Sequence, residues 1–187
     1  MLATFESVLE QPGQYLAQAY YLARNSPDRS NQTGALVFNK RGLRAGDGWN
    51  HFPPGFELTP EELFIDGQQQ DAVDELKKQK YSRVAHAEFT AVVSSYRNLQ
   101  GGVMVAPWAT CNEYAKSIVL SGLKNLVVHK ERMDLTPSRW LKDIATALIR
   151  IKANGIQLIK YSGPVDADPV YVNGSLWSPR TLSFVDK

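Results

Sequence analysis

Three side chains in the middle of the chain could together perform hydrolysis assisted by a metal ion. His86 and Glu88 stand two residues apart, and Cys111 follows later in the chain. An imidazole and a thiolate are good ligands for Zn²⁺, which acidifies a bound water. A carboxylate that stays off the metal can then carry protons to and from that water. These residue types therefore suggest attack by an activated water, with Glu88 as the acid–base group.

The spacing comes close to the signature of zinc deaminases, H-x-E followed by P-C-x-x-C. Thr110 stands where the signature has Pro, and Tyr114 stands where it has the second Cys. Zinc held only by His86 and Cys111 would bind weakly, because catalytic zinc sites normally use three protein ligands. We expect the Tyr114 phenolate or His51 to fill the gap, or the zinc to be weak, absent or replaced by another metal.

Plainer roles stay open for the same residues. Cys111 could be an inert buried thiol, which is the usual fate of a lone cysteine. Tyr114 could serve in packing, and His51 could be a loop residue or a substrate contact. We expect His129, at the end of a predicted strand, to be structural.

The composition is that of a chain with an ordinary hydrophobic core. It has 187 residues, of which 43% are hydrophobic and 21% charged, and its net charge is +2. We predict a single domain over residues 1–187. The small net charge, without a basic run interleaved with aromatic residues, gives no support for a nucleic-acid surface. One cysteine and the lack of a long apolar window lead us to expect a soluble, cytoplasmic protein without a membrane partner.

Alternating helix and strand patterns must position these side chains. We predict helices at 12–25, 85–98, 111–122 and 136–155, and strands at 34–39, 43–50, 101–108, 124–130 and 156–162. Residues 51–83 are interpreted as an insertion over the site, and 163–187 as an irregular tail. His86 and Cys111 both lie where a loop enters a helix, so neighbouring helix starts would bring them together at the carboxyl ends of strands. The positive end of a helix should also lower the pKa of a thiol.

Several further motifs occur in an order that is more specific than any one of them. They are Ser26-x-Asp28, Thr33-Gly34-Ala35-Leu36-Val37, Gly48-Trp49-Asn50-x-x-Pro53-x-Gly55, Lys80-Tyr81-x-x-Val84-x-His86-Ala87-Glu88, and Ala115-Lys116-Ser117-Ile118 with Ser121-Gly122. On these motifs the chain resembles the deoxycytidylate deaminase branch of the cytidine deaminase-like superfamily. The resemblance covers most of residues 12–162 and does not extend to the tail.

The resemblance implies a three-layer α/β/α fold, with a five-stranded mixed sheet of order 2-1-3-4-5 flanked by helices. It implies hydrolytic loss of the 4-amino group of deoxycytidine monophosphate (dCMP). Zinc would be bound by His86 and Cys111, and Glu88 would protonate N3 of the base while deprotonating the water. Family members are commonly oligomeric, so the resemblance also implies a homo-oligomer that binds a small-molecule nucleotide.

Substrate contacts follow from the same resemblance. Asn50 would contact the sugar or the phosphate, and Ser26 and Arg29 are candidate phosphate contacts. Thr90 replaces the Asn of the family pattern H-A-E-x-N-A, and His51 replaces a Gly that usually follows the loop Asn. We expect both residues to shape the pocket. Trp108, at the end of the strand before Cys111, could line the base.

Three functions remain open on the sequence. The first is a deaminase of dCMP or a modified dCMP-like nucleotide with an unconventional metal site. The second is an inactive relative that binds nucleotide or regulates a partner, and the third is a different reaction on the same scaffold. We favour the enzyme, because a carboxylate such as Glu88 is costly at the bottom of a pocket unless the protein uses it.

Overall fold

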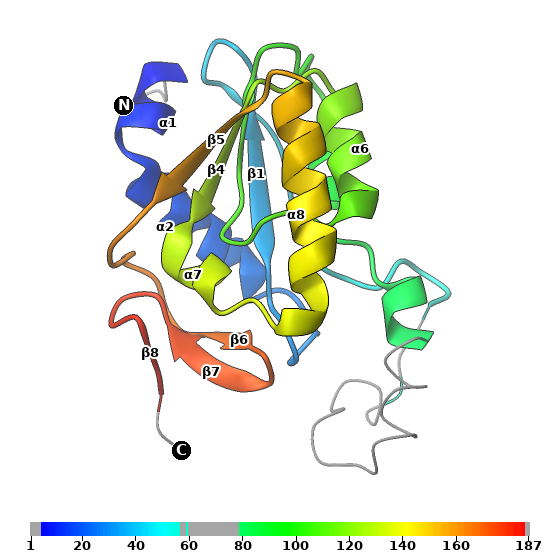
Figure 1. Cartoon of the computed structure of the whole chain (residues 1–187), viewed down its shortest axis with the longest axis vertical. Helices are drawn as coiled ribbons and strands as arrows, with labels where there is room; N and C mark the ends of the chain where they lie inside the picture. The colour runs from blue at the N-terminus through cyan, green and yellow to red at the C-terminus, as the bar shows by residue number, and fades with distance from the viewer. Residues whose placement is uncertain (1–4, 57–58, 60–78, 186–187) are drawn as a thin grey trace.

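The computed structural model describes residues 5–56, 59 and 79–185. Its main sheet has five strands in the order β2-β1-β3-β4-β5 (Figure 1). The strands are β1 (Gly34–Phe38), β2 (Arg44–Trp49), β3 (Val103–Val105), β4 (Asn125–His129) and β5 (Gln157–Tyr161). β1 pairs antiparallel with β2 and β3, whereas β3 with β4 and β4 with β5 are parallel. The predicted fold class and strand order are confirmed.

Helices cover both faces of this sheet (Figure 1). They are α1 (Phe5–Glu10), α2 (Pro12–Ala23), α5 (Ala87–Val93), α6 (Asn112–Leu120), the short α7 (Lys130–Asp134) and α8 (Ser138–Ala153). Alternate residues of a strand point to opposite faces. Leu36 and Phe38 of β1 accordingly pack in the core under α1 and α2, while Ala35 and Val37 pack in the core under α5, α6 and α8. β1 is therefore apolar throughout because both of its faces are covered.

Helix α5 lies unusually close to strand β2, and Gly48 makes this approach possible. A Cβ at Gly48 would lie 2.6 Å from Cβ of Thr90 and 2.8 Å from the carbonyl oxygen of Ala87. Only glycine fits there without moving the helix. The position of α5, and of the residues at its start, thus depends in part on having glycine at position 48 of β2.

The predicted helices and strands of 12–162 that fall within the described residues are present, although several are shorter. α5 spans Ala87–Val93 instead of 85–98, and the hydroxyl of Ser95 bonds back to the carbonyl of Ala91 just beyond its end. β3 spans Val103–Val105 instead of 101–108, since Pro107 has no N–H to donate. The short helices α1 and α7 were not expected from sequence. Most of the predicted insertion at 51–83 lies outside the described residues.

The C-terminal segment differs from the prediction of an irregular tail over 163–187. β6 (Val170–Val172), β7 (Ser175–Ser178) and β8 (Ser183–Phe184) form a second, antiparallel sheet. Asn173 and Gly174 join β6 to β7, and both have positive φ, as a two-residue hairpin turn requires. Val170, Val172 and Trp177 are buried in the same core as the residues of α2. The prolines of this segment obscured an Asn-Gly hairpin that is part of the main core.

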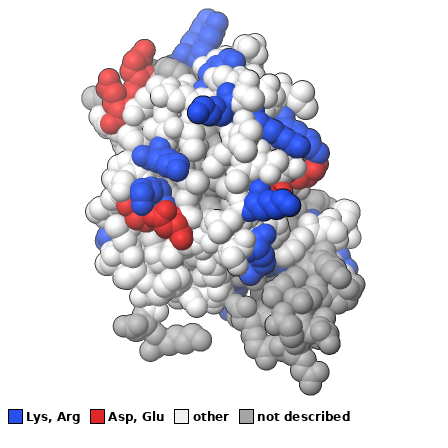
Figure 2. All heavy atoms as spheres, in the orientation of Figure 1, with Lys and Arg blue, Asp and Glu red and all other residues white. Residues whose placement is uncertain are grey.

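No helix among the described residues is long and apolar enough to cross a membrane. Figure 2 shows the face formed by α6 and α8, where Lys and Arg side chains are scattered, some of them directly beside Asp and Glu side chains. The exposed basic residues of these two helices are Lys116, Arg139, Lys142, Arg150 and Lys152. On the face shown they do not form a continuous band.

Candidate active site

A cavity opens where α5 and α6 begin. The empty space within it is about 660 Å³, a volume that includes open solvent at its mouth. Its lining includes several polar side chains and the aromatic rings of Tyr81, Trp108 and Trp140. The flat aromatic walls suit a flat ring, and the polar side chains can fix its orientation.

His86 and Cys111 meet inside this cavity. His86 is the N-cap residue of α5 and Cys111 is the N-cap residue of α6. Sγ of Cys111 lies 3.7 Å from Nδ1 of His86. Two ligands of one tetrahedral zinc would lie about 3.5 Å apart, given bond lengths of about 2.0–2.1 Å to nitrogen and about 2.3 Å to sulfur. The spacing of this pair therefore suits two ligands of one zinc ion.

A third ligand is not in place beside them. The Tyr114 ring packs against the His86 ring, with centroids 4.6 Å apart, but its hydroxyl donates to the carbonyl oxygen of Val84 at 3.3 Å. Nδ1 of His51 lies 3.1 Å from the carbonyl oxygen of Trp49. Among the residues that the structure describes, no group of three His, Cys, Asp or Glu side chains could hold a metal ion. The side chains present thus do not fit an ordinary three-ligand catalytic zinc site.

Glu88 lies in the first turn of α5 and lines the cavity. Its side chain is buried, with 4% of the residue exposed. Burial raises the pKa of Glu88 to about 7, and hydrogen bonds from its own backbone and from the Thr110 side chain partly oppose this rise. Within the described part of the chain, no Lys or Arg forms an ion pair with this carboxyl.

Burial also controls the protonation of the two possible ligands. It lowers the pKa of His86 to about 4, so the imidazole is neutral at neutral pH, the form that binds metals. Burial, followed by the nearby Glu88 charge, raises the pKa of Cys111 to about 11. Backbone N–H groups of Glu113 and Tyr114 lower it by less. The helix start thus lowers the pKa of this thiol, as expected, but burial outweighs it and the net change is a rise.

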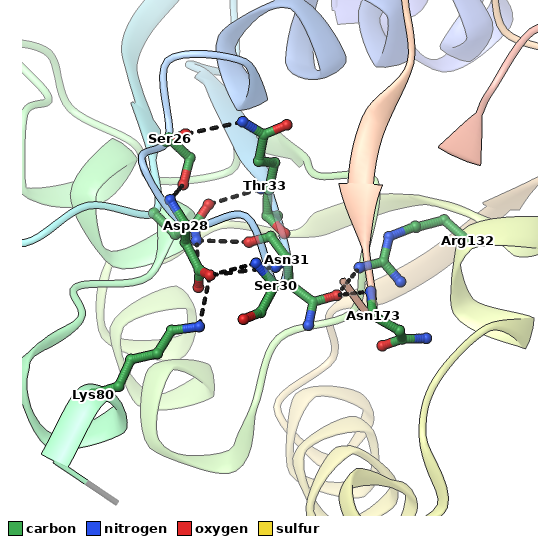
Figure 3. Close-up of polar contacts among 10 residues, drawn as sticks. Ser26, Asp28, Ser30, Asn31, Thr33, Lys80, Arg132 and Asn173 are labelled. Carbon is green, nitrogen blue, oxygen red and sulfur yellow. Dashed lines mark hydrogen bonds and ion pairs between the residues drawn. The ribbon is translucent and has the colours of Figure 1, made fainter. Parts of the chain in front are cut away.

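A buried polar network also lines the cavity (Figure 3). Nζ of Lys80 lies 2.6 Å from Oδ1 of Asp28, and both side chains are almost fully buried. Asn50 accepts from the backbone N–H of Thr33 at 2.7 Å and donates to the carbonyl of Asn31 at 2.8 Å. All five residues line the cavity. Asn50, predicted to contact substrate, thus uses its amide to hold the loop beside it.

The structure separates the other predicted contacts into two groups. Trp108 lines the cavity, and its indole N–H donates to the hydroxyl of Thr136 at 2.8 Å. Ser26, Arg29 and Thr90 do not line it, and neither does His51. Ser26 accepts from the backbone N–H of Asp28 at 3.1 Å, and the Thr90 hydroxyl donates to the carbonyl oxygen of His86 at 3.0 Å. The Arg29 guanidinium lies over the Tyr171 ring, 5.9 Å from its centroid.

Sequence reasoning did not assign Asp28, Asn31, Thr33 or Lys80 to the site. Three of them, Asp28, Thr33 and Lys80, belong to motifs that carried the family resemblance, so their place in those motifs was the available signal. Asn31 gave no signal of its own. His129 is buried, donates from Nε2 to the Gly163 carbonyl, is hydrogen-bonded through Nδ1 to the Tyr20 hydroxyl, and does not line the cavity, as expected of a structural residue.

Comparison with known proteins identifies the family to which this site belongs. Residues 9–130 match the family model described as the cytidine and deoxycytidylate deaminase zinc-binding region. The chain belongs to this family. The match includes the whole His86, Glu88 and Cys111 constellation, and with it the position of Tyr114. The resemblance drawn from the motifs is thereby confirmed.

Relatives and solved structures agree with this family. The chain is 28% identical over 150 residues to a deoxycytidylate deaminase of Pongo abelii, covering 78% of this chain and 81% of the relative. It is 29% identical over 152 residues to the Mus musculus deoxycytidylate deaminase, with the same two coverages. The crystal structure of dCMP deaminase from the cyanophage S-TIM5 in complex with dCMP and dUMP shares the fold, with a TM-score of 0.57, 20% identity and coverage of 82% and 96%.

Proposed function

We propose that this deaminase-family protein hydrolyses the 4-amino group of a pyrimidine deoxynucleotide, dCMP or a modified dCMP-like nucleotide. Family membership and the names of the curated relatives support the reaction and the substrate class. The cavity supports it too, because flat aromatic walls stand beside a buried carboxyl group.

The observation that carries this proposal is the placement of Glu88. Its carboxyl group lies buried in the cavity, beside His86 and Cys111, and no basic side chain of the described residues neutralises it. Burying such a group without an ionic partner costs stability. Buried, unneutralised acids in clefts are accordingly characteristic of groups that transfer protons.

The chemistry assigns this carboxyl group two proton transfers. Water adds to C4 of the pyrimidine and the amino group leaves as ammonia, so the water must lose protons while N3 and then the leaving nitrogen gain them. Glu88 takes one proton from the attacking water and delivers it to N3, then takes the second from the added hydroxyl and delivers it to the leaving amino nitrogen. Trp108 and Trp140 bound the space for the base, and the Asp28–Lys80 pair lies on the polar wall. His86 and Cys111 supply one zinc ligand fewer than usual, so we assign no step to a metal.

The incomplete ligand set favours a second candidate function. A protein that keeps the pocket but lacks a working metal site would bind the nucleotide without converting it, alone or as a regulatory subunit. The orientation of the Tyr114 hydroxyl toward the Val84 carbonyl supports this alternative. Both candidates bind the same class of nucleotide, but only the first converts it.

The test is a deamination assay on dCMP, run with and without added zinc, together with a binding titration. We expect the wild-type protein to release ammonia and form dUMP. Glu88→Gln should keep dCMP binding and folding but lower turnover by at least about a hundredfold, as expected for loss of a general acid–base group.

Three other outcomes are informative. Binding without turnover would replace the enzyme with the nucleotide-binding alternative. A Glu88→Gln variant with full activity would contradict the role of this carboxyl group. Neither binding nor turnover of dCMP would leave the third possibility, another substrate or reaction on this scaffold.

A further inference from the structure

One wall of the cavity is a loop, residues 28–33, that has little regular structure of its own. Asp28, Asn31 and Thr33 of this loop line the cavity. Asn50 bonds to the loop from the side of β2, and Lys80 pairs with Asp28. The opposite side of the loop needs support as well, because a wall that moves cannot hold a ligand in one orientation.

The tip of the β6–β7 hairpin supplies this support (Figure 3). The backbone N–H of Asn173 donates to Oδ1 of Asn31 at 3.2 Å, and that of Gly174 donates to the carbonyl of Ser30 at 2.9 Å. Gln32 donates from its backbone to the carbonyl of Tyr171 at 2.9 Å. Its side-chain oxygen accepts from the Tyr171 backbone N–H at 3.1 Å. The loop is thereby held to the hairpin, with one isolated antiparallel bridge between Asn31 and Val172.

Arg132 of α7 connects the same loop to an aromatic wall. Its Nη2 donates to Oδ1 of Asn31 at 2.9 Å, and its guanidinium lies 4.5 Å from the centroid of the Trp108 ring. Arg132 is 1% exposed, and its Nη1 has no hydrogen-bond partner among the residues that the structure describes. A buried arginine without a carboxylate partner is costly. Arg132 contacts both Asn31 and Trp108, which line the cavity, so its burial there is explained by its holding these two side chains in place.

We infer that the C-terminal sheet is a structural part of the substrate pocket, and that Asn173 and Arg132 are positioning residues that hold Asn31 and Trp108 in place. This inference rests on the proposed function only in taking dCMP as the ligand. The family match ends at residue 130, so both positioning residues lie beyond it. The pocket wall of this chain therefore depends on a segment outside the matched family region.

Two variants test the inference in the full-length protein. Asn173→Ala keeps the backbone N–H but removes the bond from Nδ2 of Asn173 to the Leu135 carbonyl at 2.9 Å, and it leaves alanine at φ 51°, a left-handed conformation that alanine adopts with more strain than asparagine. It changes no charge and no lining residue. Arg132→Met removes the bond to Asn31 and the contact with Trp108. Arg180→Met is the matched control for Arg132→Met, because Arg180 is an exposed arginine of the C-terminal segment that pairs with Asp166 instead. The measurements are dCMP binding by calorimetry and hydrogen–deuterium exchange of each segment.

We expect both variants to weaken dCMP binding by about tenfold, in line with the usual worth of one or two such hydrogen bonds. In both variants the amides of residues 30–33 should exchange faster, while those of α8 should exchange at the wild-type rate. Arg180→Met should show wild-type dCMP binding and wild-type exchange throughout. If turnover is observed, KM should rise with little change in kcat. Unchanged binding and unchanged loop exchange in Asn173→Ala would overturn the inference. Faster loop exchange in a protein whose wild type does not bind dCMP would uphold the positioning role and contradict the proposed function.

Discussion

Tyr114 is the residue on which the chemistry of this site depends most. It stands three residues after Cys111 on α6, where the zinc deaminase signature has its second cysteine. Its ring contacts both His86 and Phe89, with centroids 4.6 Å and 5.4 Å away. Burial raises the pKa of the Tyr114 phenol above its ordinary value of 10.0, which further disfavours the phenolate that a metal would need. Tyr114 therefore occupies the position of the second cysteine ligand but does not supply a metal ligand in its place.

Replacing Tyr114 with cysteine should restore a three-ligand site. Structural zinc sites with four ligands gain about 10–16 kcal/mol, so one thiolate contributes about 3 kcal/mol, or about a hundredfold in affinity. We expect Tyr114→Cys to tighten zinc binding by that factor in a competition titration with a chromophoric chelator. Tyr114→Ser is the matched control, since it removes the same ring but adds a poor zinc ligand. An equal affinity in the two variants would mean that position 114 does not face the metal.

The residue scale also shows what the sequence could predict of the site. The constellation of His86, Glu88 and Cys111 follows from spacing alone, since helix starts bring the three together. The Lys80–Asp28 ion pair does not, because its partners are 52 residues apart and no local pattern joins them. Nor could the sequence show that burial outweighs the helix start at Cys111, since burial depends on the packing of the whole domain.

At the scale of elements, the site depends on how closely α5 packs on β2. Gly48→Ala would place a Cβ within 2.8 Å of three atoms of α5, two of which belong to the backbone. Overpacking of this kind costs about 1–3 kcal/mol. We expect the variant to lose that much stability in urea unfolding and to bind dCMP more weakly, because α5 carries His86 and Glu88 at its start.

Gly13→Ala provides the control for this substitution. A Cβ at Gly13 would meet only the end of the Tyr161 ring, at 3.0 Å, and a side chain can move where a backbone cannot. It should fold with nearly wild-type stability and bind dCMP normally. If Gly48→Ala behaves in the same way, the close approach of α5 is not needed to place the site.

The elements were predictable to different degrees for physical reasons. β1, β4 and α8 have strong apolar patterns, and the structure places them within a few residues of the predicted bounds. The short strands β6, β7 and β8 have only two to four residues each, too few for a pattern to stand out among prolines. The turn Asn173-Gly174 between two apolar runs was the usable signal there.

At the scale of the whole molecule, His129 ties the two sheets together. It ends β4. Its Nε2 donates to the Gly163 carbonyl at 2.9 Å, and its Nδ1 is hydrogen-bonded to the Tyr20 hydroxyl of α2 at 2.7 Å. Its ring also packs against Trp177 of β7. The helix layer, the main sheet and the C-terminal sheet thus meet at one imidazole. Whether copies of the chain assemble, as the family resemblance implies, stays a prediction.

This junction should make stability depend on pH. The groups that face His129 are Tyr20, Glu131, Arg132 and Tyr161. Burial lowers the pKa of His129 below its ordinary value of 6.5, although the Gly163 carbonyl and Glu131 oppose it. The unfolded chain therefore binds a proton at this position that the folded protein resists, so stability falls as pH drops below about 6.5.

His129→Gln should weaken this dependence. The variant will be less stable than wild type at pH 7.5, since it loses the fit between the two sheets, but the difference should shrink as pH falls toward 5. Urea unfolding at a series of pH values measures it. His86 and Glu88 titrate in both proteins, so their contributions cancel in the comparison. Parallel stability curves would mean that His129 does not gain a proton on unfolding, and that the junction holds the two sheets together without responding to pH.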